Sequence, residues 1–181
     1  VRAISAVDGL DLVAVSRRNE KALEDFCTRY GVQGYTDYND LVTDERVDAV
    51  IISTPHNKHT EAVEAAAAKG LHILLEKPLA ENADGVKRIV KAVEKSQGKF
   101  MGSYSNHFTP AFKKAKEIVF SGEIGKPVSG SSSMHKLWMS PERRDWHLYR
   151  KNGGGMWLTI GVHLVDRLTF LFQSQVESVS A

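Results

Sequence analysis

Apolar residues in the first part of the chain gather in short continuous runs, and each run is followed by a longer amphipathic stretch. Continuous runs without alternation are typical of strands buried on both faces, whereas the longer stretches have the periodicity of helices. The pattern predicts strands at 10–15, 48–53, 71–75 and 99–104, and helices at 20–30, 60–69 and 82–96.

Helix-ending residues agree with this division of the chain. Gly31 and Gly70 each follow a predicted helix, where a glycine can adopt the left-handed cap, and Asn82 is a good N-terminal cap. Strands that alternate with helices form parallel sheets covered on both sides. We therefore expect an α/β fold with a Rossmann-type, doubly wound parallel sheet.

The regular alternation of apolar runs and amphipathic stretches ends after residue 104. A helix is predicted at 111–120, then a serine-rich strand at 128–135, and finally a helix that opens with glycines at 153–155. We expect a dinucleotide-binding domain over residues 1–104. The beginning of an α+β C-terminal domain with an open sheet, for substrate binding and dimerisation, is expected over 105–181.

Composition excludes several classes of protein. The 181 residues are 42% hydrophobic and 25% charged, which is typical of a soluble globular protein. The 24 basic and 22 acidic residues are interspersed, so neither nucleic acid nor a membrane surface is an expected partner. Cys27 is the only cysteine, and no apolar run is long enough to span a membrane, so a reducing, cytoplasmic location is expected.

In open α/β sheets ligands bind at the carboxyl ends of strands, so residues at these ends are candidates for chemistry. Ser16, Arg17 and Arg18 follow the first predicted strand and would suit the 2′-phosphate of NADP, although two arginines alone are more often a solvated turn. Segment 54–59 (TPHNKH) follows the next strand and is either a capped turn or a set of free amides facing a ligand.

Lys77 follows the strand at 71–75 in the stretch LHILLEKPLAEN. Burial of that strand would partly desolvate the amine and lower its pKa toward the range useful for proton transfer. Pro78 restricts Lys77 to extended geometry, so the amine is held in place. A lone Lys-Pro after a strand is usually only a turn. Its coincidence with the other two strand ends favours a site.

The stretch NGGGMWLTIGVHLVDRL contains the remaining candidates. Its glycines do not form a G-x-G-x-x-G fingerprint, and they permit either close packing or approach of a ligand. Helical spacing places Thr159, His163 and Asp166 on one stripe. A single helix histidine is more often a core or capping residue than a catalyst.

Several motifs together resemble the Gfo/Idh/MocA family of oxidoreductases: EKP at 76–78, TPHNKH at 54–59, F-x-P at 108–110, SGEIGKP at 121–127, and GGG-x(5)-G-x-H-x-x-D at 153–166. The resemblance implies a Rossmann domain followed by a domain with a large open sheet. It also implies hydride transfer between a nicotinamide cofactor, with NADP favoured over NAD, and a carbohydrate or polyol. A homo-oligomer is expected for the full-length protein.

By the same resemblance Lys77 relays the proton of the reacting hydroxyl, and His163 is a second acid/base or orienting group. The implied cofactor contacts are Ser16, Arg17, Arg18, Thr54, Pro55, His56, His59, Glu76 and Lys77. The implied substrate contacts are His107, Trp146, His147, Thr159 and His163.

The chain departs from the family pattern at several places. Thr159 stands where members commonly have an acid, and His107 and the Trp146–His147 pair stand where many have arginine. The family's first strand and glycine loop would precede Val1, and its sheet would extend past Ala181, so we expect a longer gene product. A non-catalytic relative that binds dinucleotide or sugar as a regulator remains the competing hypothesis, and an inactive fragment is a third.

Overall fold

The computed structural model describes residues 1–180, which contain two parallel sheets. The smaller sheet pairs β1 (Ala14–Ser16) with β2 (Gln33–Tyr35). The larger sheet has the order β3 (Ala49–Ile52), β4 (His72–Glu76) and β5 (Phe100–Ser103). The predicted α/β class with parallel strands is confirmed, but the strands form two sheets instead of one. Strand β2 was not predicted, because three residues carry too little pattern to be recognised.

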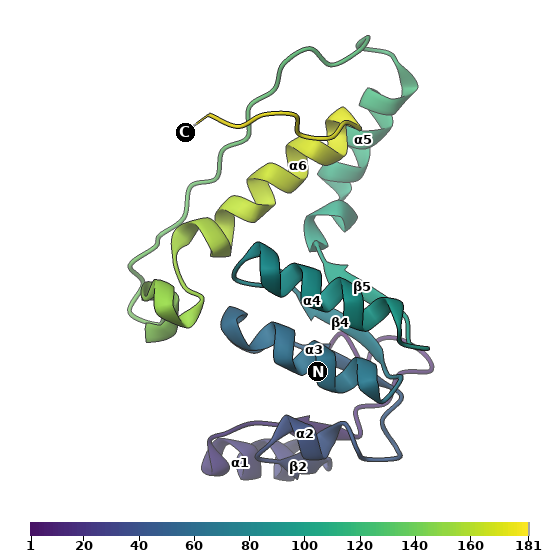
Figure 1. Cartoon of the computed structure of the whole chain (residues 1–181), viewed down its shortest axis with the longest axis vertical. Helices are drawn as coiled ribbons and strands as arrows, with labels where there is room; N and C mark the ends of the chain where they lie inside the picture. Colours follow the sequence, from purple (N-terminus) through teal and green to yellow (C-terminus); the bar gives the residue numbers. More distant parts are fainter. Residues whose placement is uncertain (181) are drawn as a thin grey trace.

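The helices are α1 (Glu20–Tyr30), α2 (Tyr38–Leu41), α3 (His59–Ala68), α4 (Ala83–Glu94), α5 (Pro110–Ser121) and α6 (Val162–Phe172). Figure 1 shows them in three tiers, with α1 and α2 beside the small sheet, α3 and α4 on the large sheet, and α5 and α6 together beyond it. The predicted helix ends are confirmed. Gly31 has φ 66°, Gly70 has φ 72°, and Asn82 Oδ1 accepts from Gly85 N at 2.9 Å.

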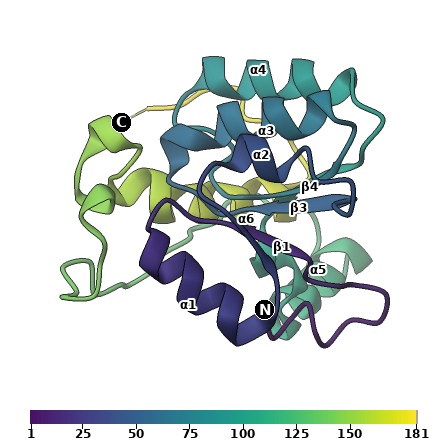
Figure 2. The same cartoon turned by 90° about the horizontal axis from the view of Figure 1, so that it is seen from below.

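The core lies between the large sheet and the layer formed by α3 and α4, which cover the same face of β3 and β4 (Figure 2). Leu75 and Val63 are fully buried, and Ile89 is 1% exposed. Arg88 Nε donates to Glu64 Oε1 at 2.9 Å and joins the two helices on their outer side. This layer fixes the position of β3 and β4, and therefore of the residues at their carboxyl ends.

The opposite face of the large sheet exposes apolar side chains. Ile51 and Met101 both pair with Leu74 and therefore share this face, and they are 56% and 48% exposed. The reason is that α1 packs against the small sheet, whereas α5 and α6 pack against each other.

The chain after α5 has no strand at 128–135, so the predicted serine-rich strand is wrong. The segment passes alongside α6 (Figure 1), and Gly130 approaches the side chains of Leu168 and Phe172 closely. A strand requires a neighbour with which to exchange hydrogen bonds. This segment packs against a helix and has no such neighbour among the described residues.

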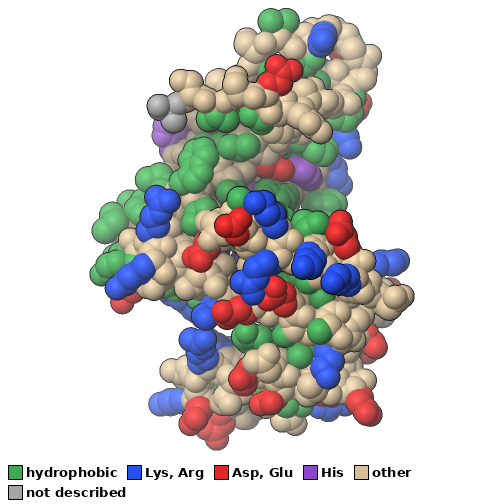
Figure 3. All heavy atoms as spheres, viewed as in Figure 1, with side chains coloured by type: hydrophobic (Ala, Val, Ile, Leu, Met, Phe, Trp, Pro, Cys, Tyr) green, Lys and Arg blue, Asp and Glu red, His purple; other side chains and the backbone are tan. Residues whose placement is uncertain are grey.

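Surface features agree with the mixed charge of the sequence. Figure 3 shows basic and acidic side chains interspersed over the face that it draws. Over residues 1–180, no helix is both long and apolar enough to cross a membrane.

Candidate active site

Two segments that follow neighbouring strands meet at one edge of the large sheet. Because β3 and β4 are parallel and Ile52 pairs with Leu75, the residues after both strands emerge on the same side. The fully buried His59 side chain joins them. Its Nδ1 lies 2.8 Å from the Pro78 carbonyl oxygen, and its Nε2 lies 2.9 Å from that of Thr54. Both ring nitrogens face backbone carbonyls, so His59 braces the edge and has no ring nitrogen left for a ligand.

Lys77 leaves this edge and reaches the C-terminal part of the chain. Its amine donates to the main-chain carbonyl of Thr159 at 2.7 Å, across a sequence separation of 82 residues. Thr159 belongs to a π-helical turn, Trp157–Gly161, that leads directly into α6. Such turns occur frequently at functional sites. The predicted stripe of Thr159, His163 and Asp166 is therefore not on one regular α-helix.

The environment of Lys77 lowers the pKa of its amine. Burial lowers its pKa below the ordinary lysine value, the negative charge of Glu76 opposes this shift, and the positive charge of Lys136 adds to it. Ser103 Oγ donates to Glu76 Oε1 at 3.2 Å, which holds the carboxylate beside the strand end. The sequence-based expectation of a partly desolvated lysine agrees with this environment.

His163 forms a hydrogen bond with Asn106, which lies in the 3-10 turn Ser105–Phe108. Asn106 Nδ2 donates to His163 Nδ1 at 3.1 Å. Burial lowers the pKa of His163, and the nearby positive charges of Lys77 and Arg167 lower it further. Lys77 and His163 therefore lie close enough for the charge of one to affect the protonation of the other.

His107 belongs to the same turn, and its contacts are with other residues than Lys77 and His163. Its Nε2–H donates to Asp166 Oδ2 at 2.8 Å, and its ring packs on Phe170 and Phe112 with centroids 4.1 and 5.4 Å apart. These contacts use the ring to attach the turn to α6. The structure therefore gives His107 an anchoring environment.

His56 connects the edge of the sheet to the glycine run. Its Nδ1–H donates to the Gly153 carbonyl at 2.6 Å, and its ring meets Trp146 edge-on at 4.8 Å. Burial lowers the pKa of His56 to about 4, so the ring is neutral near pH 7. A Cβ on Gly153 would lie 2.7 Å from Asn57 N, and one on Gly154 would overlap the Trp146 carbonyl oxygen. At these two positions the glycines serve close packing.

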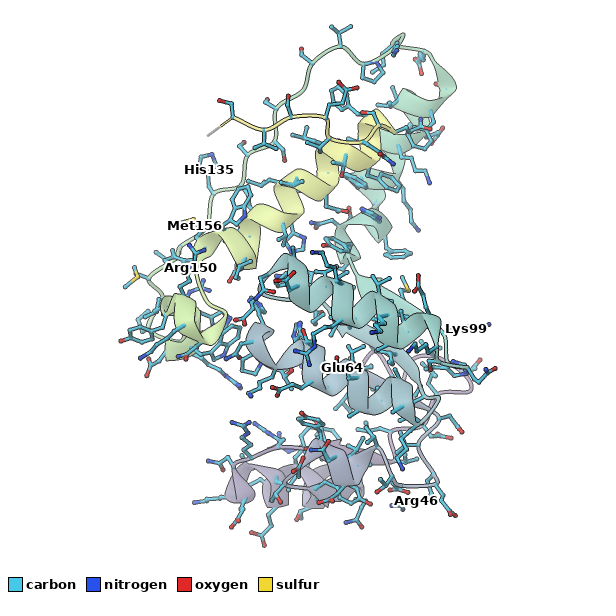
Figure 4. All side chains as sticks on the ribbon, viewed as in Figure 1. Arg46, Glu64, Lys99, His135, Arg150 and Met156 are labelled. Carbon is cyan, nitrogen blue, oxygen red and sulfur yellow. The ribbon has the colours of Figure 1, made fainter. Side chains whose placement is uncertain are left out.

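Trp146 and His147 form a stacked pair, with ring centroids 3.7 Å apart, in the short turn before the glycine run. Burial lowers the pKa of His147, and the positive charges of Arg143, Arg144 and Lys77 lower it further. A shallow hollow of about 330 Å³ adjoins His147 and is lined by Arg143 and Arg144. Figure 4 shows that Arg150 and Met156 lie near each other, close to the start of α6.

Ser16, Arg17 and Arg18 lie at the end of β1, which belongs to the other sheet. Arg17 Nη1 donates to the Ala22 carbonyl at 3.2 Å, and Arg18 is exposed. None of the hydrogen bonds formed by residues 1–180 joins these three side chains to the Lys77 region.

Two buried hydroxyls in this region have no hydrogen-bond partner within the described part of the chain: Thr54 Oγ1 and Thr159 Oγ1. Buried polar atoms are normally paired, so each of these two hydroxyls retains an unused hydrogen-bonding capacity. No group of three side chains among the described residues could hold a metal ion.

Reasoning from the sequence missed Asn106, because an asparagine beside a histidine carries no motif of its own.

Comparison with known families decides the classification. Residues 1–104 match the model of an oxidoreductase family with an NAD-binding Rossmann fold, and residues 112–181 match the GFO/IDH/MocA C-terminal domain. The chain belongs to the GFO/IDH/MocA oxidoreductase family. This confirms the resemblance inferred from the EKP and G-x-H-x-x-D motifs.

Individual relatives agree with the family. Myo-inositol 2-dehydrogenase of Thermotoga maritima is 31% identical over 98% of this chain and 52% of its own length. D-xylose 1-dehydrogenase [NADP(+)] of Haloarcula marismortui is 30% identical over 98% of this chain and 52% of its length. Levoglucosan dehydrogenase, in complex with NADH and levoglucosan, is 26% identical with a TM-score of 0.80, covering 88% of this chain and 45% of that one. The chain thus spans about half the length of the relatives that it matches.

Proposed function

We propose that the full-length protein is an NAD(P)-dependent dehydrogenase that interconverts a sugar or polyol hydroxyl and the corresponding carbonyl, with NADP as the preferred cofactor. The single observation that supports this most strongly is the contact between the Lys77 amine and the Thr159 carbonyl. The proposal is supported by the lowered pKa of this lysine, by the effect of its charge on the pKa of His163, and by membership of a family of NAD-binding oxidoreductases. We also propose a domain boundary near residue 105.

Within this function Lys77 is the proton acceptor for the substrate hydroxyl. A neutral amine has a lone pair for that proton, and the lowered pKa increases the neutral fraction near pH 7. The Thr159 carbonyl accepts one amine hydrogen and so orients the lone pair. His163 stands on the other side of the proposed reacting oxygen and orients it.

The residues at the sheet edge fit a nicotinamide cofactor. The buried Thr54 hydroxyl has no hydrogen-bond partner among residues 1–180, so it could donate to an amide or phosphate oxygen of a bound cofactor. Thr54 and Pro55 would line the cofactor, while Arg17 and Arg18 would meet the adenosine ribose and its 2′-phosphate. When bound, the nicotinamide supplies the two-electron acceptor for the hydride. His59 acts on the cofactor only through the backbone that it holds.

The test is turnover by the purified full-length protein with a panel of polyols, aldoses and anhydrosugars, each offered with NADP⁺ and with NAD⁺. Cofactor reduction is followed by absorbance. We expect turnover with at least one polyol or sugar, and a higher kcat/KM for NADP⁺ than for NAD⁺. Cofactor and sugar binding without any turnover in either direction would contradict the proposal and favour a regulatory role.

A further inference from the structure

Asn106 determines what His163 can do chemically. The side-chain amide nitrogen of asparagine can only donate hydrogen bonds, so the contact of 3.1 Å from Asn106 Nδ2 requires a lone pair on His163 Nδ1. A neutral imidazole carries a proton on only one of its two nitrogens. That proton must then be on Nε2, which has no partner among the hydrogen bonds of the described residues.

The surroundings of His163 support the neutral ring. Burial, Lys77 and Arg167 all lower its pKa, and the charges of Asp166 and Glu76 oppose this only in part. Asp166 Oδ2 accepts from His107 at 2.8 Å, and none of the hydrogen bonds of residues 1–180 joins the Asp166 carboxylate to His163. Tyr104 meets the His163 ring edge-on with centroids 6.4 Å apart, which adds packing without another proton acceptor at Nδ1.

We infer that Asn106 is a positioning residue that holds His163 in the Nε2–H tautomer, so that His163 donates a hydrogen bond to the substrate oxygen and Lys77 alone receives the hydroxyl proton. This inference rests on the proposed function and assigns different roles to Lys77 and His163. In the oxidative direction the O–H bond breaks and its proton passes to the Lys77 amine. The His163 Nε2–H stays on the ring and stabilises the oxygen while negative charge develops there.

Replacing Asn106 with aspartate reverses this arrangement. A carboxylate only accepts, so it would draw the ring proton to Nδ1 and turn Nε2 toward the substrate as an acceptor. Asn106→Leu removes the donor and leaves the tautomer free. Ser105→Ala is the matched control, because Ser105 lies in the same turn, is exposed and forms none of the side-chain hydrogen bonds found among residues 1–180 with His163.

The experiment records ¹⁵N NMR spectra of histidine-labelled full-length protein without ligands, with His163→Gln to assign the signal, together with kcat and KM of each variant. We expect Nε2–H in the wild type and in Ser105→Ala, and Nδ1–H in Asn106→Asp. In Asn106→Asp we expect kcat to fall roughly 100- to 1,000-fold with KM little changed, which is the scale of one lost hydrogen-bond donor to a developing negative charge.

A wild-type ring protonated on Nδ1 would overturn the inference, as would an Asn106→Asp variant that changes tautomer but keeps wild-type kcat. The NMR spectra report the tautomer of His163 whether or not the protein turns over a substrate. A wild type that shows Nε2–H but oxidises no polyol or sugar would therefore contradict the proposed function while supporting the positioning by Asn106.

Discussion

The amine of Lys77 and the main-chain carbonyl of Thr159 meet at 2.7 Å, which joins the end of β4 to the π turn before α6. A backbone carbonyl does not titrate in the physiological range, so this partner of Lys77 stays the same as the pH changes. The contact brings together the EKP motif and the G-x-H-x-x-D motif, which are far apart in the sequence. The stability of the surrounding segments therefore matters for the position of the amine.

Gly154 permits the glycine run to lie against Trp146 and His147. A Cβ at this position would overlap the Trp146 carbonyl oxygen and lie 2.6 Å from that of His147, and neither backbone atom can move freely. We expect Gly154→Ala to lower the free energy of unfolding by roughly 3 kcal/mol, the upper part of the range for overpacking. Urea denaturation measures it. Gly125→Ala, where nothing lies within 4 Å, should cost only about 1 kcal/mol for its left-handed backbone.

His56 should make stability depend on pH. Its pKa falls from 6.5 to about 4 in the folded protein, so its contribution is present above pH 6.5 and is lost as the pH falls toward 4. The His56→Asn variant keeps a donor near the Nδ1 position, but its amide does not titrate.

The difference in free energy of unfolding between the wild type and His56→Asn should therefore shrink by about 2–3 kcal/mol between pH 7 and pH 4. Urea denaturation at several pH values, with both proteins measured in parallel, cancels the effects of other titrating groups. A difference that stays constant over this range would show that His56 is not buried in neutral form.

His59 should contribute to stability through its two backbone contacts. A neutral His59 ring donates to one of the two carbonyls, of Thr54 or of Pro78, so His59→Leu leaves that carbonyl without its partner, at roughly 1–3 kcal/mol. The control is His72→Leu, since the exposed His72 ring accepts from Lys99 N at 2.8 Å at the other end of β4. Thermal unfolding should show a clearly larger loss for His59→Leu. Equal losses of stability in the two variants would mean that the contacts of the His59 ring with backbone carbonyls contribute little.

Arg18 should discriminate between the two cofactors. Its side chain is exposed at the end of β1, whereas Arg17 already donates to the Ala22 carbonyl. We expect Arg18→Ala to weaken NADPH binding by roughly tenfold or more, the effect of one charge-assisted hydrogen bond, and to leave NADH binding unchanged. Fluorescence titration of the full-length protein measures both. Tighter binding of NADH than of NADPH by the wild type would contradict the assignment.

Local signals in the sequence were sufficient for much of the Rossmann half. The helix over Glu20–Tyr30 and the caps at Gly31 and Asn82 follow from periodicity and from side-chain chemistry within a few residues. The strand predicted at 128–135 failed because a serine-rich extended segment reads as a strand, while its pairing depends on neighbours elsewhere in the chain.

Motifs in the sequence select the candidate residues, but they do not give the geometry of the site. Lys77 and His163 were found from motifs, yet no local pattern shows that Lys77 binds the Thr159 carbonyl or that Asn106 faces His163. Likewise, the two histidines at 56 and 59 read as ligand contacts, whereas both rings bind backbone carbonyls. These contacts are formed by tertiary packing, which sequence spacing does not encode.

The most direct test of the account is the turnover of Lys77→Ala in the full-length protein, measured against pH and compared with Lys91→Ala on the exposed side of α4. The wild type and Lys91→Ala should oxidise substrate faster as the pH rises, with a midpoint below the ordinary lysine pKa, because burial lowers that of Lys77. Lys77→Ala should lose roughly 100-fold or more in kcat, together with this pH dependence. A Lys77→Ala variant with wild-type turnover on the same substrate would contradict the account.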